Sequence, residues 1–548
     1  MSDQNQTTVI EQLSRRLASG AASRRTFLLR AAQAGVAIPA AAALAQVNAG
    51  SLLRVGSASA QEGKTLVVAI PQATVQLDPS IAGSNGYGDI IPVTDNVTEG
   101  LTRFKLGSAE IEPALAESWE VSEDGLTYTF KIRPNVTFHD GTPLDAKAVE
   151  ANFLRQFDET NPLHDEGMVY AGVIFQDVEK IEATGDMELT ITLTKPSILL
   201  PGNLAVFAAG IVSPTALEKA GKEFGQAVVG TGPFKLDAFN KDVQIDLVAF
   251  DDYWGGRPAL DKVIFRTIAE DTVRLSELQT GSIDVANQID FKDAETIAAD
   301  PNLQLITGPF LNVQFLAMNQ SLAPFDNVEV RKAVEHAINK QNIADAVFYG
   351  KYTLGGGPIA PPLPGYDEAL ADVWTYDPEL SKSILADAGV EGVEFELLSR
   401  PNSVWPLIAQ LVQADLAAVG ITATIRTLED AEFFKELGSG KVAAFLNDWT
   451  WDNGDPDNII SPIFASDRAL LRLGYDSLPV KTLAAKGQVE TDPAVRTQIY
   501  LDAAKQILDD SVMVVLGYPE RGIGAQKKVQ NLQVSPVGSL VLRAVDLA

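Results

Sequence analysis

The segment WTWDNGDPDNI at residues 449–459 concentrates side chains that can do chemistry. Its eleven positions hold two tryptophans and three aspartates, Trp449, Trp451, Asp452, Asp455 and Asp457. Such a group can hold a metal ion, supply a pair of catalytic carboxylates, or form a rigid pocket for a cation. The calcium-binding loop pattern D-x-[DN]-x-[DN]-G does not fit, because Gly454 and Pro456 stand at the wrong positions. Spacing alone leaves paired catalytic carboxylates open.

Strand geometry suggests how this segment presents its side chains. Alternation places Trp449 and Trp451 on one side, opposite Thr450, so both indoles are expected to wall a site. Asp452 faces another direction if the strand ends there. The polar residues that follow are expected to cap and shape a turn: Asp455, Asp457 and Asn458. The simpler alternative is a solvated turn with both tryptophans in the core.

The composition argues against several other kinds of site. The chain has 548 residues and no cysteine, which removes disulfides, thiolate metal sites, cysteine nucleophiles and a lipid anchor on cysteine. Its three histidines, His139, His164 and His336, are far apart, so a histidine metal site is not favoured. No GxSxG or HExxH motif supports a hydrolase. We expect no enzyme activity, no metal and no cofactor, and a structural role for His139.

Two further patterns exclude nucleotide and nucleic-acid binding. In VVGTGPFKL at 228–236, Lys235 stands where the GxGxxG pattern requires its last glycine, and a strand follows instead of a helix. Gly230, Gly232 and Pro233 are expected to turn the backbone sharply between domains. The net charge is −29, and no basic run follows the first thirty residues, so a nucleic-acid surface is excluded.

The N-terminus predicts export. SRRTFLLRAAQAGVAIPAAAALA at 23–45 has paired arginines before an alanine-rich, weakly apolar stretch. The SRRxFL pattern resembles a twin-arginine export signal. Cleavage is expected after Ala60, because the strand-like KTLVVAI at 64–70 follows at once, with Ala45 as the alternative site. The mature protein is expected in the periplasm, and it is not expected to be a lipoprotein.

Hydrophobic periodicity predicts two kinds of scaffold within a chain long enough for two or three domains. Hairpins are predicted over 117–141, with Asp124-Gly125 in the turn, and over 178–194. A helix is predicted to start at Asp145. The stretch 96–225 is therefore expected to be an α+β unit.

After residue 310 the pattern alternates between helix and strand. Asp326 and Glu329 predict a capping box at a helix start. Residues 406–420 predict a helix that has Leu407, Leu411, Ala414 and Ala418 along one side, and a strand follows at 421–428. This order predicts an α/β layer with ligand loops at the strand ends.

Several stretches, in order, resemble one family. They are VTEGLTRF (97–104), PALAESWEVSEDGLTYTFKIRPNVTFHDGTPLDAKAV (113–149), VGTGPF (229–234), YWGGRPALDKVIF (253–265), VRKAVEHAINK (330–340) and WTWDNGDPDN (449–458). Together they resemble the peptide-type solute-binding proteins, family 5, of bacterial ABC importers, which include dipeptide- and oligopeptide-binding proteins. The resemblance spans essentially the whole mature chain.

This resemblance implies an α/β fold, a two-lobed clamp of the periplasmic binding protein type II with an extra α+β domain. The expected parts are a signal peptide (1–60), a first lobe (61–95, 226–310 and 516–548), an extra domain packed on it (96–225) and a second lobe (311–515). The ligand is expected between the lobes. The loaded monomer is expected to dock on a membrane permease that has separate ATPase subunits.

The resemblance also implies site residues. The family's aspartate that pairs with the ligand's α-ammonium group matches Asp452. The arginine that holds the ligand's carboxylate matches Arg400, before Pro401, although the stretch that follows is one residue shorter and lacks the usual tyrosine. Ser84 and Asn85 lie where relatives offer backbone hydrogen bonds to the ligand, and a plain surface turn is the alternative there. Two such anchors would fix the ligand's length, because an extended chain advances by a set distance per residue. The resemblance implies a short peptide of two or three residues.

Alternatives remain for both the ligand and Arg400. Relatives take opines, nickel chelates, haem or sugars; the scarcity of histidine argues against metal, and Asp452 favours a ligand with an amine. A hydrolase that uses the acidic segment, or a folding helper, would be a different class of function. Arg400 would be structural if it pairs with an acid of its own lobe.

Overall fold

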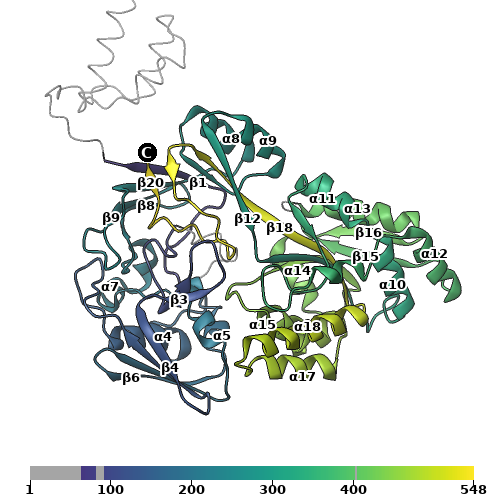
Figure 1. The fold of residues 1–548 in the computed structure, drawn as a ribbon, viewed down its shortest axis with the longest axis horizontal. Coiled ribbons are helices and arrows are strands. Elements are labelled where there is room, and N and C mark those ends of the chain that lie inside the picture. Colours follow the sequence, from purple (N-terminus) through teal and green to yellow (C-terminus); the bar gives the residue numbers. More distant parts are fainter. Residues whose placement is uncertain (1–62, 82–91, 402–403) are drawn as a thin grey trace, which may run out of the picture. The chain divides into compact units, whose positions relative to one another are not determined.

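The computed structural model describes residues 63–81, 92–401 and 404–548 (Figure 1). The predicted export signal, both predicted cleavage sites, and the predicted contacts Ser84 and Asn85 lie outside the described residues. The chain from Gly63 onward packs as one unit around a continuous twelve-stranded sheet.

One half of this sheet contains β1 (Thr65–Ile70), β8 (Phe234–Asn240), β9 (Gln244–Ala249), β10 (Lys262–Thr267), β11 (Val285–Asn287) and β12 (Leu303–Pro309). β1 runs parallel to β10 and β11, and β10 continues through β9 to β8 in antiparallel pairing. The sequence of β1, TLVVAI, is rich in β-branched residues and mostly buried, as expected for a strand covered on both faces.

The other half contains β13 (Asn312–Met318), β14 (Tyr352–Leu354), β15 (Glu394–Ser399), β16 (Thr422–Thr427) and β17 (Ala444–Thr450). β15 runs parallel to β16 and β17, as the helix–strand alternation predicts. All seven residues of β13 are buried, because β17 and a further long strand flank it on both sides.

That long strand, β18 (Met513–Gln526), belongs to both halves (Figure 1). Its first residues pair with β13 and β14, and its last residues pair with β11 and β12. Beside it, β12 leads into β13 through Phe310 and Leu311. The chain therefore crosses between the halves along β18 and at residues 310–311.

Helices surround the second half: α10 (Val328–Ala337), α11 (Lys340–Phe348), α12 (Pro378–Asp387), α13 (Trp405–Ala418) and α14 (Asp430–Leu437). The predicted capping residue of α10 is wrong by one position. Asn327, not Asp326, is the N-cap, and its side chain accepts a hydrogen bond from the backbone N–H of Glu329. An amide oxygen at this position satisfies a backbone donor that the first turn leaves unpaired.

The buried side of α13 also differs from the side singled out in the sequence. Ile408, Val412 and Leu416 are buried against the sheet, whereas the predicted side begins at Leu407, which is 41% exposed. The helix carries apolar residues on both sides, so periodicity alone does not determine which side meets the strands. Packing against β15 and β16 makes that choice.

The predicted α+β unit contains a four-stranded antiparallel sheet in the order β4-β5-β7-β6, with α4 packed on β6 and β7. Its main elements are β4 (Ala116–Val121), β5 (Thr127–Ile132), α4 (Ala146–Phe157), β6 (Val178–Gly185) and β7 (Glu188–Leu193). Both predicted hairpins are confirmed. Asp145 is the N-cap of α4, and its side chain accepts from the N–H of Ala148 at 2.8 Å.

Shorter elements complete these two regions. Around the four-stranded sheet lie β2 (Thr102–Phe104), β3 (Ile111–Pro113), α5 (Ala171–Ile174), α6 (Leu200–Asn203), η2 (Phe207–Ala209), α7 (Pro214–Ala220) and η3 (Gly221–Gln226). Elsewhere lie α8 (Asp271–Thr280), η4 (Phe291–Asp293), α9 (Ala294–Ala299), η5 (Glu368–Asp372), β19 (Val529–Gln530) and β20 (Asp546–Leu547).

After β17 the chain forms a helical segment that ends where β18 begins. It contains α15 (Asp457–Ile459), the one-turn π-helix η6 (Ile460–Phe464), α16 (Asp467–Leu473), α17 (Leu478–Gly487) and α18 (Pro493–Asp509). Helices α17 and α18 pack on each other and on η6. Among the described helices, none combines the length and the apolar character that a membrane span requires.

The glycines of VVGTGPFKL are explained by a close backbone approach. The chain bends at 231–233 and then enters β8. Gly232 donates its N–H to the carbonyl of Val97 at 2.9 Å, next to Gly230. A Cβ on Gly230 would lie 2.0 Å from that same carbonyl oxygen. Only glycine therefore lets the two backbones approach here.

Replacing Gly230 with alanine is expected to destabilise the protein by about 3 kcal/mol, because both atoms in the clash are held by the backbone. Urea denaturation would measure the loss. Gly172→Ala is the matched control, since a Cβ there meets nothing within 4 Å, and we expect no loss. Equal stability of the two variants would contradict the steric explanation.

Candidate functional site

One cavity lies between the α+β unit and the helical segment after β17, and a second, smaller cavity adjoins it at β17. Their volumes are about 670 Å³ and 450 Å³, within the usual range for small-molecule sites. The larger is lined by residues from around α5 and α6 and by residues from η6 to α17. The smaller is lined by β17, α14 and α16. Both cavities share four lining residues, Tyr170, Trp449, Asp452 and Arg468.

β17 carries segment 449–459 to these cavities. Its antiparallel pairing with β13 places Thr450 opposite Asn312, whose amide donates to Thr450 Oγ1 at 2.9 Å and to Asp448 Oδ2 at 2.7 Å. Beyond the strand, Gly454 has a φ of +67°, and a Cβ there would lie 3.1 Å from a backbone carbonyl oxygen. Glycine therefore suits this tight turn.

The polar residues after Asp452 are engaged in shaping this turn. Asp455 accepts the N–H of Asp457 at 2.9 Å and forms an ion pair with Arg496 at 2.8 Å. Asp457 is buried and accepts hydrogen bonds from three side chains, Ser461, Gln488 and Tyr500. These two carboxylates hold the fold of the segment, as predicted for them.

Asp452 differs from its neighbours because its carboxylate makes no hydrogen bond or ion pair with any described residue. It is partly buried and lines both cavities. Burial raises the pKa of Asp452 from 3.8 to about 7. Burial and, secondarily, the charge of Asp452 raise the pKa of Tyr170, so the two side chains lie near each other. The cavities therefore contain a carboxylate that no described residue neutralises.

The two tryptophans have different environments. Trp449 lines both cavities, and its Nε1–H donates to Asn458 Oδ1 at 3.0 Å. Trp451 is completely buried in the hydrophobic core and is not among the cavity-lining residues. β17 ends at Thr450, so strand alternation no longer determines the direction of Trp451. Of the two tryptophans predicted to wall the site, only Trp449 lines the cavities.

Arg400 lines the smaller cavity together with Asp452. Its guanidinium is buried, donates to Asp448 Oδ1 and lies 3.8 Å from Asp430 Oδ1. It also stacks over Trp405, with its Cζ 5.3 Å from the ring centroid. Its charge is therefore matched by acids on β17 and α14. This is the pairing expected if Arg400 has a structural role.

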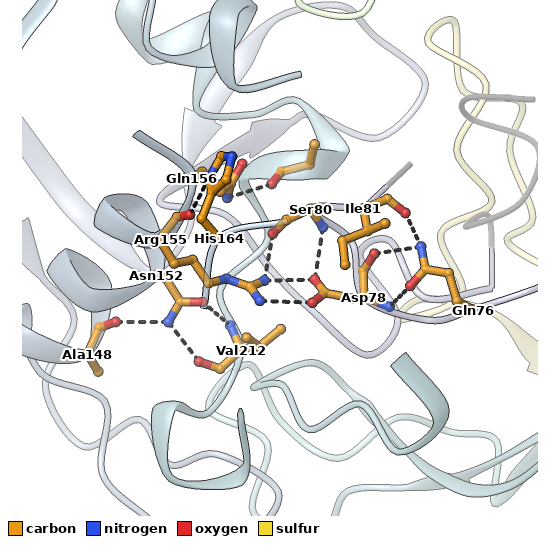
Figure 2. Close-up of polar contacts among 11 residues, drawn as sticks. Gln76, Asp78, Ser80, Ile81, Ala148, Asn152, Arg155, Gln156, His164 and Val212 are labelled. Atoms are coloured by element: carbon orange, nitrogen blue, oxygen red, sulfur yellow. Dashed lines mark hydrogen bonds and ion pairs between the residues drawn. The ribbon is translucent and has the colours of Figure 1, made fainter. Parts of the chain in front are cut away.

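Ser84 and Asn85 lie outside the described residues, but the segment that leads to them is firmly anchored (Figure 2). Asp78 accepts two hydrogen bonds from the guanidinium of Arg155 on α4, at 2.8 and 2.7 Å. The same guanidinium donates to Ser80 Oγ at 2.7 Å. Both charged side chains are almost fully buried. This network fixes residues 78–80 against the α+β unit.

Several cavity-lining residues were not singled out in the sequence. Tyr170 precedes a helix of only four residues, in a stretch without clear periodicity. Arg468 and Arg472 stand four positions apart on α16, a spacing that places them on one side of a helix. That spacing was the available signal, but no motif marks it.

The histidines are engaged with backbone groups. His139 Nε2 lies 2.9 Å from the carbonyl oxygen of Gly232, and burial lowers the pKa of this imidazole to about 4. His164 and His336 each hydrogen-bond to a carbonyl, of Arg155 and Thr375. Within residues 63–81, 92–401 and 404–548, no three histidine or acidic side chains are grouped to hold a metal ion.

Comparison with known proteins relates this chain to one family. Residues 110–470 match the model of bacterial extracellular solute-binding proteins, family 5 Middle. The dipeptide-binding protein of Escherichia coli strain K12 is 32% identical over 519 residues, which cover 89% of this chain and 95% of that protein. Heme-binding protein A of Haemophilus influenzae is 35% identical over 395 residues, which cover 68% and 72%.

A solved structure, the periplasmic binding protein DppA from Helicobacter pylori in complex with the peptide STSA, has a similar fold. The TM-score is 0.76 at 29% identity, and the match covers 88% of this chain and 98% of that one. Physically, this site offers an apolar and aromatic wall, one carboxylate that no described residue neutralises, and nearby guanidinium groups. This arrangement suits a small, charged, partly apolar solute.

Proposed function

The chain belongs to the bacterial extracellular solute-binding proteins of family 5, and on this premise we propose that it captures short peptides of two or three residues for an ABC importer. The predicted α/β fold of periplasmic binding proteins is confirmed by the similarity in fold. Such proteins bind and deliver solutes and are not enzymes. A permease and its ATPase subunits are the proposed partners.

The observation that carries the proposal is the carboxylate of Asp452. It stands where two cavities meet and has no partner among the described residues. In a water-poor cavity, an ammonium group that donates hydrogen bonds to a carboxylate gains more than it would in bulk water. We therefore assign Asp452 to the ligand's free amine. Trp449 forms the adjacent wall, and Trp451 supports the segment from the core.

The other predicted residues rest on different kinds of support. Arg400 lines the smaller cavity, but its guanidinium already pairs with the carboxylate of Asp448. Ser84 and Asn85 are proposed as contacts on the strength of the family resemblance. We propose lobe and domain boundaries at 95/96, 225/226, 310/311 and 515/516. The two crossings between the halves of the sheet, along β18 and at residues 310–311, are the proposed hinges. Export by the twin-arginine route to the periplasm is proposed from residues 23–60. The mature protein is proposed to act as a monomer.

Calorimetric titration with a panel of free dipeptides and tripeptides tests this function. We expect saturable 1:1 binding to some members of the panel. Mass spectrometry of ligand that remains bound after purification would identify the solute independently. Binding to no peptide, together with tight binding of haem, an opine or a sugar, would reject the proposal.

Affinity for such peptides is expected to depend on pH through Asp452. Its pKa of about 7 means that the carboxyl is increasingly protonated below neutrality, when it cannot pair with an ammonium group. Affinity should therefore fall by up to about tenfold for each pH unit below 7. Above about pH 8 the peptide's own α-amine loses its proton and affinity should fall again.

Titrations between pH 5.5 and 9 would show this maximum near pH 7.5. Asp452→Asn is the control, because it removes the titrating group and should flatten the acidic limb only. An acidic limb that is unchanged in this variant would show that another group titrates.

A further inference from the structure

The smaller cavity is lined by two further arginines, whose charge is opposite in sign to that of Asp452. Arg468 and Arg472 lie one helical turn apart on α16 (Asp467–Leu473). Both line the smaller cavity, and Arg468 also lines the larger one. Arg468 is exposed and Arg472 is partly buried. The two guanidinium groups thus face the space that Asp452 faces.

Neither guanidinium has a partner in the part of the chain that the structure describes. Each lacks an ion pair and a hydrogen bond there, and the buried Nε of Arg472 is unsatisfied. Burial and, secondarily, the charge of Arg468 lower the pKa of Arg472, and no acid offsets these effects. The protein has 72 acidic and 43 basic residues, yet no acid among the described residues pairs with these two neighbouring arginines.

Other cations that line the cavities are already matched. Arg400 pairs with Asp448, Lys195 with Asp177, and Lys481 with Asp476. Binding a ligand's anion at any of these groups would compete with an existing ion pair. Arg468 and Arg472 can offer all of their guanidinium hydrogen-bond donors to a ligand, because no described residue has to be displaced.

Asp452 and the two arginines share a cavity without pairing with each other. No ion pair joins them, and the pKa of Asp452 is raised by burial with no cation that lowers it. Leaving the partly buried charges of Asp452 and Arg472 uncompensated is unfavourable, so such an arrangement is expected where a ligand completes it. The complementary ligand carries a cation at one end and an anion at the other.

We propose that Arg468 and Arg472 form the subsite for the ligand's carboxylate, and that Arg400 positions Asp448 and the cavity wall instead of anchoring the ligand. This rests on the proposed function, because it supplies the second end of a zwitterionic peptide whose amine meets Asp452. Two guanidinium groups give a carboxylate up to four charge-assisted hydrogen bonds, which makes a free C-terminus a condition for tight binding.

The test compares the tightest-binding dipeptide of the panel with the same dipeptide amidated at its C-terminus. Titrations use the wild type, Arg468→Gln, Arg472→Gln and the double variant. Lys505→Gln on α18 is the charge-matched control, because Lys505 is exposed and lies outside both cavities. We expect amidation to weaken wild-type binding on the order of 10- to 100-fold. Arg472→Gln should weaken binding of the free dipeptide by a similar factor and should hardly change binding of the amidated dipeptide.

The outcomes separate the two proposals. Suppose that the wild type binds dipeptides, but the arginine variants lose equal affinity for the free and the amidated dipeptide, or lose no affinity. The proposed subsite is then wrong and the proposed function stands. If the wild type binds no dipeptide, the proposed function fails. The subsite is then tested by thermal stabilisation with millimolar butyrate: stabilisation of the wild type that the double variant loses supports it, and equal or absent stabilisation overturns it.

Discussion

Asp452→Asn is expected to weaken binding of a free-amine dipeptide by about 2–4 kcal/mol, or on the order of 30- to 1,000-fold, at pH 7.5. Asparagine keeps the shape and one acceptor oxygen but removes the charge, so an ammonium group would enter the cavity without a counter-ion. Calorimetric titration measures the loss. The N-acetylated form of the same dipeptide has no cation, so its weaker binding should change by less than about threefold.

The matched control is Asp252→Asn, the same chemical change at an exposed residue that makes no hydrogen bond or ion pair with the described residues. It should bind both peptides like the wild type. Equal losses for the free and acetylated peptides in Asp452→Asn would mean that Asp452 shapes the site without contacting the amine.

The unliganded protein should respond to the same substitution in the opposite direction. The pKa of Asp452 is raised in the folded chain, so its contribution to stability is fully present below its ordinary pKa and is lost as pH rises through about 7. Asparagine is neutral at every pH and avoids that loss. A variant that binds worse but unfolds no more easily is the signature of a residue retained for ligand binding.

Much of the fold is predictable because local chemistry and tertiary packing agree. The alternation in β5 and β7 predicts their buried faces, and Asp145 caps α4 as its side chain requires. The prediction fails where two local solutions have similar energy. Asn327 and Asp326 are both good caps, and the apolar residues of α13 cover both of its sides. Only the surrounding structure decides such cases.

The site is less predictable, because its residues come from distant parts of the chain. Asp452 stands out in the sequence through its acidic segment and through the family resemblance, and neither shows that Asp455 and Asp457 are engaged in hydrogen bonds. Tyr170 comes from the α+β unit, nearly three hundred positions away. The pairing of Arg400 with Asp448 depends on β15 lying beside β17. Charge compensation is a property of the assembled fold, and it is what separates a structural arginine from an available one.

The ion pair of Asp78 and Arg155 (Figure 2) illustrates the opposite case, a charge that the protein neutralises completely. Both side chains are at most 3% exposed, and Ser80 satisfies a further donor of the guanidinium. The nearby Nε of Arg155 is the one buried donor of this group without a partner. Such a pair contributes little net stability when it is intact, but losing one member leaves a buried charge alone.

Arg155→Met is therefore expected to destabilise the protein by about 3–5 kcal/mol, because the Asp78 carboxylate would remain buried without its cation. Urea denaturation followed by tryptophan fluorescence measures the loss. Adding Asp78→Asn removes the unpaired charge. It also keeps an acceptor for the N–H of Ser80, which donates to Asp78 Oδ1 at 3.1 Å in the wild type. The double variant should consequently be more stable than Arg155→Met alone, by about 1–2 kcal/mol. If the second substitution adds to the damage instead, lost packing of the arginine side chain, and not the uncompensated carboxylate, dominates the effect.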